Sequence, residues 1–155
     1  MRRIFVDVDG VLADFYGHYF SIFGYRLNQY NETPETMANI RNYHHFYRDI
    51  PLLPDALELW GGIKKFDPNP TILTGYPVSV PWAKLDKKIW IVENLGVRTE
   101  VIICLSREKY KYGKQGDILI DDRTKFRHLW KNMGGIFILH TSAQITLTEL
   151  RQIYS

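Results

Sequence analysis

Two pairs of aspartates, each at the end of a short β-rich run, could together hold a divalent cation. Asp7 and Asp9 end the first run, which Gly10 closes, and strand alternation predicts that their carboxylates point to the same side. Asp121 and Asp122 end a later run. Carboxylates this close repel unless a cation lies between them or one takes a proton. Mg²⁺ fits best, because it binds carboxylates, water and phosphate. Alternatively, each pair caps a following helix.

The ends of two further runs carry groups that suit an anionic substrate. Thr74 offers a hydroxyl and Gly75 a free backbone amide, which can hold a phosphate. Arg107 and Lys109 supply positive charge that would offset a transferring phosphoryl group. Each fragment alone has a simpler interpretation, because a Thr-Gly pair is usually a turn and a loop lysine is usually solvated. Their occurrence at successive strand ends favours phosphate chemistry.

Continuous apolar runs predict strands that are covered on both faces, as in a parallel sheet. The expected strands are 4–9, 71–73, 101–105, 118–120 and 135–140. Helical patterns alternate with them at 82–94, where Gly96 is the expected C-cap, at 122–132, and at 146–154 with Thr146 or Thr148 as the cap. This alternation predicts an α/β fold with a doubly wound sheet.

The segment 15–65 reads differently, because it is rich in aromatic residues with helical spacing. Pro51 and Pro54 interrupt it before a last helix at 55–65. We expect a small helical cap inserted after the first strand. Ligands of open α/β sheets bind beyond the carboxyl ends of the strands, so the insert would act as a lid. The whole chain, 1–155, is expected to form a single domain.

Composition narrows the function classes further. A net charge of +3 is weaker than a dedicated nucleic-acid binder needs, which argues against long nucleic acid as a partner. No apolar run is long enough to span a membrane, and Asp7 interrupts the first apolar stretch, so we expect no membrane association and no signal peptide. A single cysteine, Cys104, is expected as a small buried group and favours a cytoplasmic setting. A homodimer is left open.

The motifs together resemble those of the haloacid dehalogenase (HAD) superfamily. Residues 7–14, Asp-Val-Asp-Gly-Val-Leu-Ala-Asp, are similar to its first motif in the form found in 5'(3')-deoxyribonucleotidases. Residues 73–75, 107–109 and 118–123 are similar to the second, third and fourth motifs, in order along the chain. The resemblance implies a HAD-like Rossmannoid fold of three layers, with a central parallel sheet and a helical cap.

The resemblance also implies a mechanism, in which the chain is a phosphatase acting on (deoxy)ribonucleoside monophosphates. Asp7 would attack phosphorus and form an aspartyl-phosphate, and Asp9 would act as general acid and then as base. Thr74 would bond a phosphoryl oxygen, while Lys109 would neutralise charge and steady Asp7.

Metal binding follows from the same resemblance. Mg²⁺ would be held by Asp7, the backbone carbonyl of Asp9 and chiefly Asp122, with Asp121 in support.

The chain departs from the family at three places. Gly75 stands where a serine is usual, so one phosphate contact would come from the backbone. The spacing to the fourth motif is longer, which leaves Lys111 or Lys114 as alternatives to Lys109. The cap is shorter.

Aromatic residues near the first motif could bind a nucleobase. Phe15 matches the position of a base-contacting ring in the family, and Phe46 with Tyr47 resembles a second wall. The alternative is that these rings form core, as aromatics at helical spacing usually do. Lys87 could reach the phosphate, although a solvated helix face is the simpler interpretation.

Other functions remain open at this stage. The same residues could serve a polynucleotide 3'-phosphate end or a small phosphorylated metabolite. A nucleotide-binding domain without activity is a third possibility. Adjacent His44 and His45 would point apart on a helix, which argues against zinc.

Overall fold

The computed structural model describes all 155 residues and is built on a five-stranded sheet in which every strand is parallel to its neighbours. The strands are β1 (Ile4–Val6), β2 (Thr71–Gly75), β3 (Glu100–Cys104), β4 (Ile118–Asp121) and β5 (Ile136–Leu139), in the order β3-β2-β1-β4-β5. The strand order reverses at β1, so the segments that follow β1, β2 and β4 meet at one edge of the sheet. Ligands of open α/β sheets bind at such a switch point.

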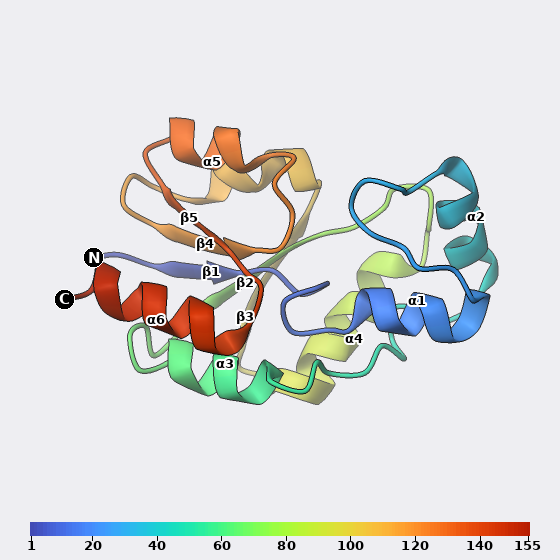
Figure 1. Cartoon of the computed structure of the whole chain (residues 1–155), viewed down its shortest axis with the longest axis horizontal. Coiled ribbons are helices and arrows are strands. Elements are labelled where there is room, and N and C mark those ends of the chain that lie inside the picture. Colours follow the sequence, from blue (N-terminus) through green and yellow to red (C-terminus); the bar gives the residue numbers. More distant parts are fainter.

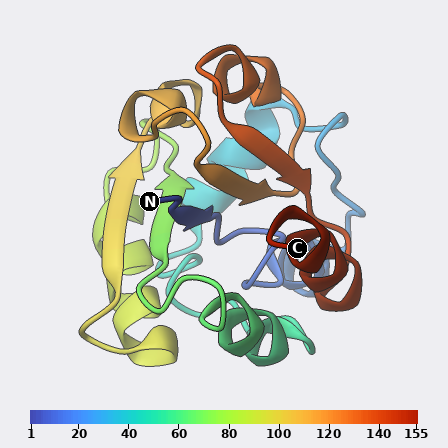
Figure 2. The same cartoon turned by 90° about the vertical axis from the view of Figure 1, so that its left-hand side faces the viewer.

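Helices cover both faces of the sheet and give three layers (Figure 2). The helices are α1 (Phe15–Phe23), α2 (Pro34–Asn42), α3 (Ala56–Ile63), α4 (Ala83–Leu95), the 3₁₀ helix η1 (Ser106–Tyr112), α5 (Arg127–Asn132) and α6 (Ala143–Ile153). Alternate strand residues face opposite sides. Ile4 and Val6 pack with α3, α4 and α6, whereas Phe5 packs with Leu119 and Trp130 on the side of η1 and α5. The predicted α/β fold class is confirmed.

The insert after β1 leaves the sheet and returns at one narrow place. Asp14 N–H donates to the Pro51 carbonyl at 2.9 Å, and Leu53 N–H donates to the Leu12 carbonyl at 2.8 Å. Helices α1 and α2 lie between these points, beyond the carboxyl ends of the strands (Figure 1). In contrast, α3 packs against α6 in the helix layer of the core. The division of the chain at 15–65 stays a prediction. The hydrogen bonds of residues 12–14 with residues 51–53 end the insert before α3 begins at Ala56.

The first strand ends earlier than predicted. β1 stops at Val6, because the carbonyl of Val8 accepts the N–H groups of residues 11, 12 and 13 and so closes a tight turn. Asp7 and Asp9 are therefore not alternate residues of one strand. Their side chains go to different partners, as described below.

Two predicted helix starts were also wrong. Strand β4 is followed by five irregular residues, and α5 begins only at Arg127 rather than at 122, so the acidic pair does not cap it. The last helix begins at Ala143, because Ser142 accepts the N–H of Ile145 as its cap at 3.2 Å. Thr146 is instead fully buried within α6, where its hydroxyl bonds the His140 ring at 2.7 Å. Gly96 ends α4 as predicted. None of the helices is long and apolar enough to cross a membrane.

Two adjacent glycines in α3 allow a test of its packing on α6. A Cβ at Gly62 would lie 2.5 Å from the Leu147 side chain, whereas a Cβ at Gly61 would meet nothing. Alanine stabilises a helix by about 0.5–1 kcal/mol over glycine. We therefore expect Gly61→Ala to raise the free energy of unfolding by this amount. Gly62→Ala should gain less or lose stability, because Leu147 must move. Urea denaturation measures both, and equal gains would contradict the packing.

Candidate active site

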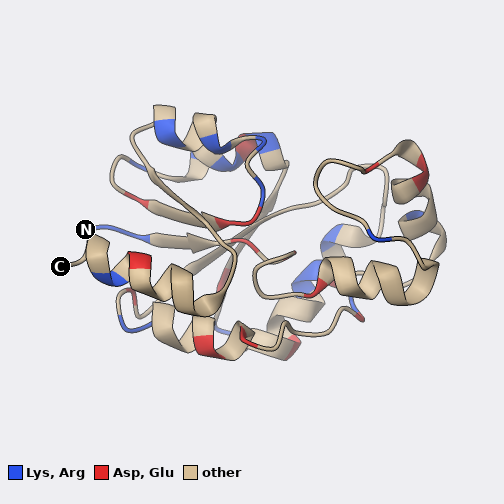
Figure 3. Ribbon diagram, viewed as in Figure 1, with Lys and Arg blue, Asp and Glu red and all other residues tan.

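Three carboxylates, two of them buried and the third half-buried, meet where β1 and β4 end. Oxygens of Asp7, Asp121 and Asp122 all lie within 4.8 Å of one another, and they form a group that could hold a metal ion. Acidic segments gather here, between the sheet and the insert (Figure 3). Asp7 and Asp121 are 6% and 7% exposed, and Oδ1 of Asp122 is buried without a hydrogen-bond partner. A buried carboxylate oxygen without a partner is costly, so this oxygen is suited to bind a cation.

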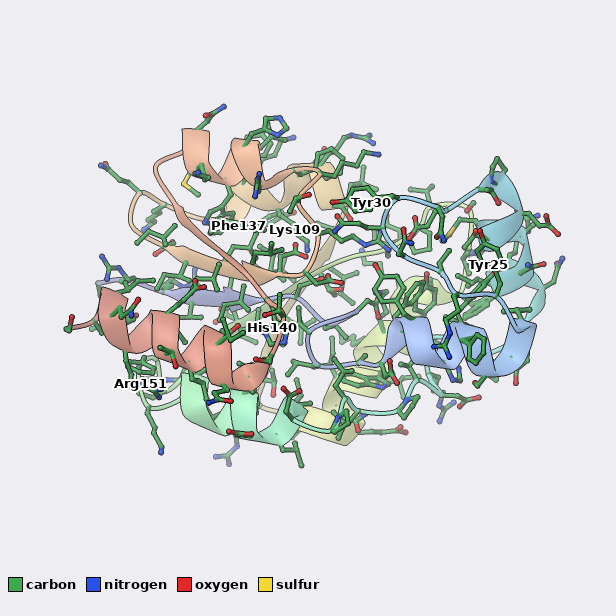
Figure 4. The ribbon with its side chains drawn as sticks, viewed as in Figure 1. Tyr25, Tyr30, Lys109, Phe137, His140 and Arg151 are labelled. Atoms are coloured by element: carbon green, nitrogen blue, oxygen red, sulfur yellow. The ribbon has the colours of Figure 1, made fainter.

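Lys109 is the cation that the protein itself supplies to this group. Its Nζ lies 3.0 Å from Oδ1 of Asp7 and 2.9 Å from Oδ2 of Asp121. Lys109 comes from η1 and lies inside the molecule on the α5 side of the sheet (Figure 4). Of the two alternatives, Lys111 is exposed and pairs with Glu108, and Lys114 is not among the cavity-lining residues. The structure therefore brings Lys109 to Asp7.

The electrostatics of the group call for more positive charge than Lys109 gives. Burial, followed by the charge of Asp121, raises the pKa of Asp7. Burial and the charges of Asp7 and Asp121 raise the pKa of Asp122 to about 9. The pKa of Asp121 is lowered, since the charge and hydrogen bond of Lys109 outweigh the effect of burial. Lys109 contacts only Asp7 and Asp121, and Asp122 is the group that a bound divalent cation would ionise.

Gly10 is required by the close approach of the first motif to Asp122. Its φ of +80° favours glycine, and an added Cβ would lie 1.9 Å from Oδ2 of Asp122. A side chain at this position would therefore push Asp122 out of the carboxylate group. The glycine between strand and insert serves the site as well as the turn.

Asp9 stands apart from the carboxylate group and forms an ion pair with Lys87 of α4. Nζ of Lys87 also lies 3.4 Å from the Thr74 hydroxyl oxygen and 4.7 Å from the centre of the Tyr47 ring. Lys87 is only 3% exposed, so its interpretation as a solvated residue was wrong. The helical spacing carried the signal, because Lys87 shares a face with Ala83 and Trp90, both buried.

A residue of the site that the sequence did not indicate is Ser106, at the start of η1. A Cβ at Gly75 would lie 2.0 Å from the Ser106 hydroxyl oxygen, so β2 and η1 approach too closely for a side chain at position 75. Both residues line the same cavity. The Ser106 hydroxyl occupies the space that a serine at position 75 would need.

Apart from Gly10 and Asp122, these groups line a cavity of about 310 Å³ between the sheet, the insert and α5. It contains the predicted site residues Asp7, Asp9, Phe15, Tyr47, Thr74, Gly75, Arg107, Lys109 and Asp121. Lys87, Ser106, Glu32, Arg123 and several apolar residues of the α5 side complete the lining.

Phe46 does not belong to this cavity. It is fully buried and packs against Phe15, Tyr19 and Phe23. Phe15 and Tyr47 line the cavity but are each only 3% exposed. The core interpretation therefore holds for Phe46, while Phe15 and Tyr47 serve both core and cavity wall. Neighbouring His45 bonds Asp86 at 3.0 Å.

Comparison with known proteins identifies the family of this chain. Residues 1–153 match the model of the family described as "5' nucleotidase, deoxy (Pyrimidine), cytosolic type C protein". The chain belongs to this family. A Bordetella bronchiseptica protein, named provisionally as a 5'(3')-deoxyribonucleotidase, is 27% identical over 140 residues, which cover 77% of this chain and 73% of that protein.

Two solved structures match the chain over nearly its whole length, and the first is similar in fold. A hydrolase from Streptococcus pneumoniae superposes with a TM-score of 0.51 at 14% identity, covering 99% of this chain and 97% of the other. A HAD hydrolase of family IA, variant 3, from Entamoeba histolytica gives a TM-score of 0.47 at 17% identity, with 98% and 89% covered. The predicted α/β fold and the resemblance to the 5'(3')-deoxyribonucleotidases are confirmed, and the chain is a member of a 5'-nucleotidase family.

The raised pKa of Asp122 predicts how stability depends on pH without metal. A carboxyl whose pKa is raised on folding holds a proton that the unfolded chain has lost, so stability falls as pH rises toward the folded value. Between pH 7 and 9 the free energy of unfolding of the metal-free protein should therefore decrease. The two histidines His18 and His140 do not titrate in this pH range, because burial lowers their pKa.

Thermal unfolding in a chelator, followed across this range, measures the effect. Mg²⁺ should stabilise the protein more at pH 8.5 than at pH 7, because the proton on Asp122 then no longer competes with the ion. The variant Asp122→Asn is the control and should flatten both dependences. A stability that rises from pH 7 to 9 would contradict the assignment of this pKa.

Proposed function

We propose that this protein is a Mg²⁺-dependent phosphomonoesterase that hydrolyses nucleoside monophosphates through an aspartyl-phosphate on Asp7. The observation that carries the proposal is the position of Asp7. Its carboxylate opens on the cavity, is held by Lys109 at 3.0 Å and lies beside the unpartnered oxygen of Asp122. A nucleophile, a fixed cation and a vacant oxygen ligand are what in-line attack on a phosphomonoester needs.

The residues present fit a divalent metal ion. Asp7, Asp122 and Asp121 would hold it, and the orphaned oxygen of Asp122 is the most direct support. An ion with oxygen ligands would offset negative charge on the transferring phosphoryl group. Among divalent ions, Mg²⁺ is the one we propose, since it favours a few carboxylates completed by water and phosphate.

In the first step, an oxygen of Asp7 bonds to phosphorus, and the bond from phosphorus to the ester oxygen breaks. Lys109 holds Asp7 in place from its other side. Asp9 protonates the departing alkoxide. Asp9 is paired with Lys87 in the free protein, and the incoming phosphoryl group can take over Lys87, which leaves Asp9 free to carry the proton.

In the second step, Asp9 removes a proton from a water molecule that attacks phosphorus. The bond between Asp7 and phosphorus breaks, and inorganic phosphate leaves. Thr74, Lys87 and Ser106 surround the place where the phosphoryl oxygens would lie, and the Gly75 amide adds a backbone donor. These donors stabilise the charge that builds up in both transition states.

The substrate class rests on the family and on the cavity. A cavity of about 310 Å³ suits a small phosphomonoester. Phe15 and Tyr47 would border the base, and Phe46 supports them from behind. The name of the Bordetella relative favours a deoxyribonucleoside monophosphate.

Phosphate release from a panel of nucleoside 5'- and 3'-monophosphates, with Mg²⁺ or with chelator, tests the proposal. We expect turnover with Mg²⁺ only, and no turnover of any monophosphate would refute it. Asp7→Asn should abolish turnover while the protein stays folded, because the amide cannot form the covalent intermediate. A preference for 3'-phosphorylated oligonucleotides or for sugar phosphates would show that the enzyme uses the same chemistry on a different substrate.

The buried position of Lys87 predicts a large effect on catalysis. Lys87→Gln should lower kcat/KM by about 10²–10³, the usual loss when one donor to a charged transition state is removed. Lys88→Gln is the matched control, because Lys88 is the exposed neighbour on the same helix. Steady-state kinetics measures both, with thermal unfolding to check that each variant is folded. Equal, small losses in the two variants would show that Lys87 does not contact the phosphoryl group.

A further inference from the structure

The loop between α1 and α2 is joined to the fourth motif by a pair of polar contacts. The guanidinium of Arg123 binds both carboxylate oxygens of Glu32 in a fork. One residue further on, the N–H of Thr124 donates to Oε1 of Gln29 at 3.2 Å. Tyr30, in the same loop, lies on the side of the insert that faces the sheet (Figure 4). The loop is thus fastened to the segment that carries Asp121 and Asp122.

The Glu32–Arg123 pair is built more firmly than a surface ion pair. Two parallel bonds between guanidinium and carboxylate fix the orientation of both groups, as single contacts do not. The side chains are 26% and 38% exposed, and both residues line the catalytic cavity. The pair therefore stands in the wall of the active site.

Arg123 is also bound to the metal-binding group through its backbone. Its N–H donates to Oδ1 of Asp121 at 3.1 Å, and its neighbour in sequence is Asp122. Burial tends to lower the pKa of Arg123, but Tyr16, Glu32 and Asp122 together raise it. The charge of Asp122 thus acts on the guanidinium, and Glu32 is the partner that holds it.

We propose that Glu32 is a positioning residue that keeps the Arg123 guanidinium away from Asp122, so that the Asp122 carboxylate stays available to a divalent cation. Without Glu32, the Arg123 guanidinium, whose charge acts on Asp122, would lose its partner in a partly buried wall. It would then turn to the carboxylates of the site and compete with the ion. The same contact would couple the position of the insert to metal binding. This inference rests on the proposed Mg²⁺ dependence.

The competition predicts a specific pattern in a mutant cycle. Glu32→Gln should weaken Mg²⁺ binding by about tenfold, the lower range for loss of a group that orients a metal ligand. Adding Arg123→Gln to it should restore most of the loss, because the competing charge is gone. A merely structural contact would give a double variant as weak as the single one, or weaker. Glu35→Gln, an exposed residue in the first turn of α2, removes the same charge and should change nothing.

Isothermal titration calorimetry of Mg²⁺ into the metal-free protein measures affinity independently of turnover. The concentration of Mg²⁺ at half-maximal activity is the second readout. Wild type that binds no Mg²⁺ would refute the proposed function itself. Wild type that binds while Glu32→Gln binds equally well, or a double variant that is not rescued, would overturn this inference alone. If Glu32→Gln does not fold, Arg123→Gln alone decides, and weakened Mg²⁺ binding there would count against competition.

Discussion

The site depends on placing like charges together where water is largely excluded. Asp7, Asp121 and Asp122 converge at the ends of two adjacent parallel strands, and their mutual repulsion has to be offset locally. Lys109 offsets part of it, and the remaining repulsion, together with burial, raises the pKa of Asp122 and so favours a proton on this carboxyl. A divalent cation in place of that proton would complete the balance. The repulsion between the carboxylates explains why Lys109 lies in contact with two of them and why Gly10 has no side chain beside Asp122.

The elements around the site are adapted to the three carboxylates as well as to core packing. Gly10 leaves room for Asp122, and Gly75 leaves room for Ser106, so both strand ends have no side chain where the site needs space. The 3₁₀ helix η1 places Lys109 in contact with Asp7 and Asp121 at the ends of β1 and β4. On the opposite face α4 buries Lys87, which would be too costly without Asp9 as its partner. Two lysines from opposite faces of the sheet thus meet the acidic groups at its edge.

Much of this could be predicted because strand ends are marked locally in the sequence. Continuous apolar runs indicated a parallel sheet, and the residues after each run belong to one edge, so Asp7, Thr74, Lys109 and Asp121 could be placed together. Ser106 could not, because its role depends on how closely two elements pack, and the burial of Lys87 was missed although its spacing from Ala83 and Trp90 indicated it. Phe46 was predicted to line the substrate cavity but is buried in the core, because apolar composition alone does not distinguish a cavity-lining residue from a core residue. The start of α5 depended on tertiary contacts of Arg123 and Thr124 that no local pattern reports.

The insert is fixed to the core at its base, along α4 and at its far side. Along α4, His45 bonds Asp86 at 3.0 Å and the Trp90 ring N–H donates to the Ile50 carbonyl at 2.6 Å. At its base, backbone hydrogen bonds join residues 12–14 to 51–53, and Leu12 and Ala13 are fully buried there. At its far side, it is held by side chains alone, at Glu32 and Gln29. Backbone pairing in the core is hard to break, whereas a side-chain ion pair at a cavity wall can open at modest cost. Motion of the insert should therefore pivot about its base and open at Arg123, directly beside the carboxylates, so substrate entry and the charge balance of the site are physically linked.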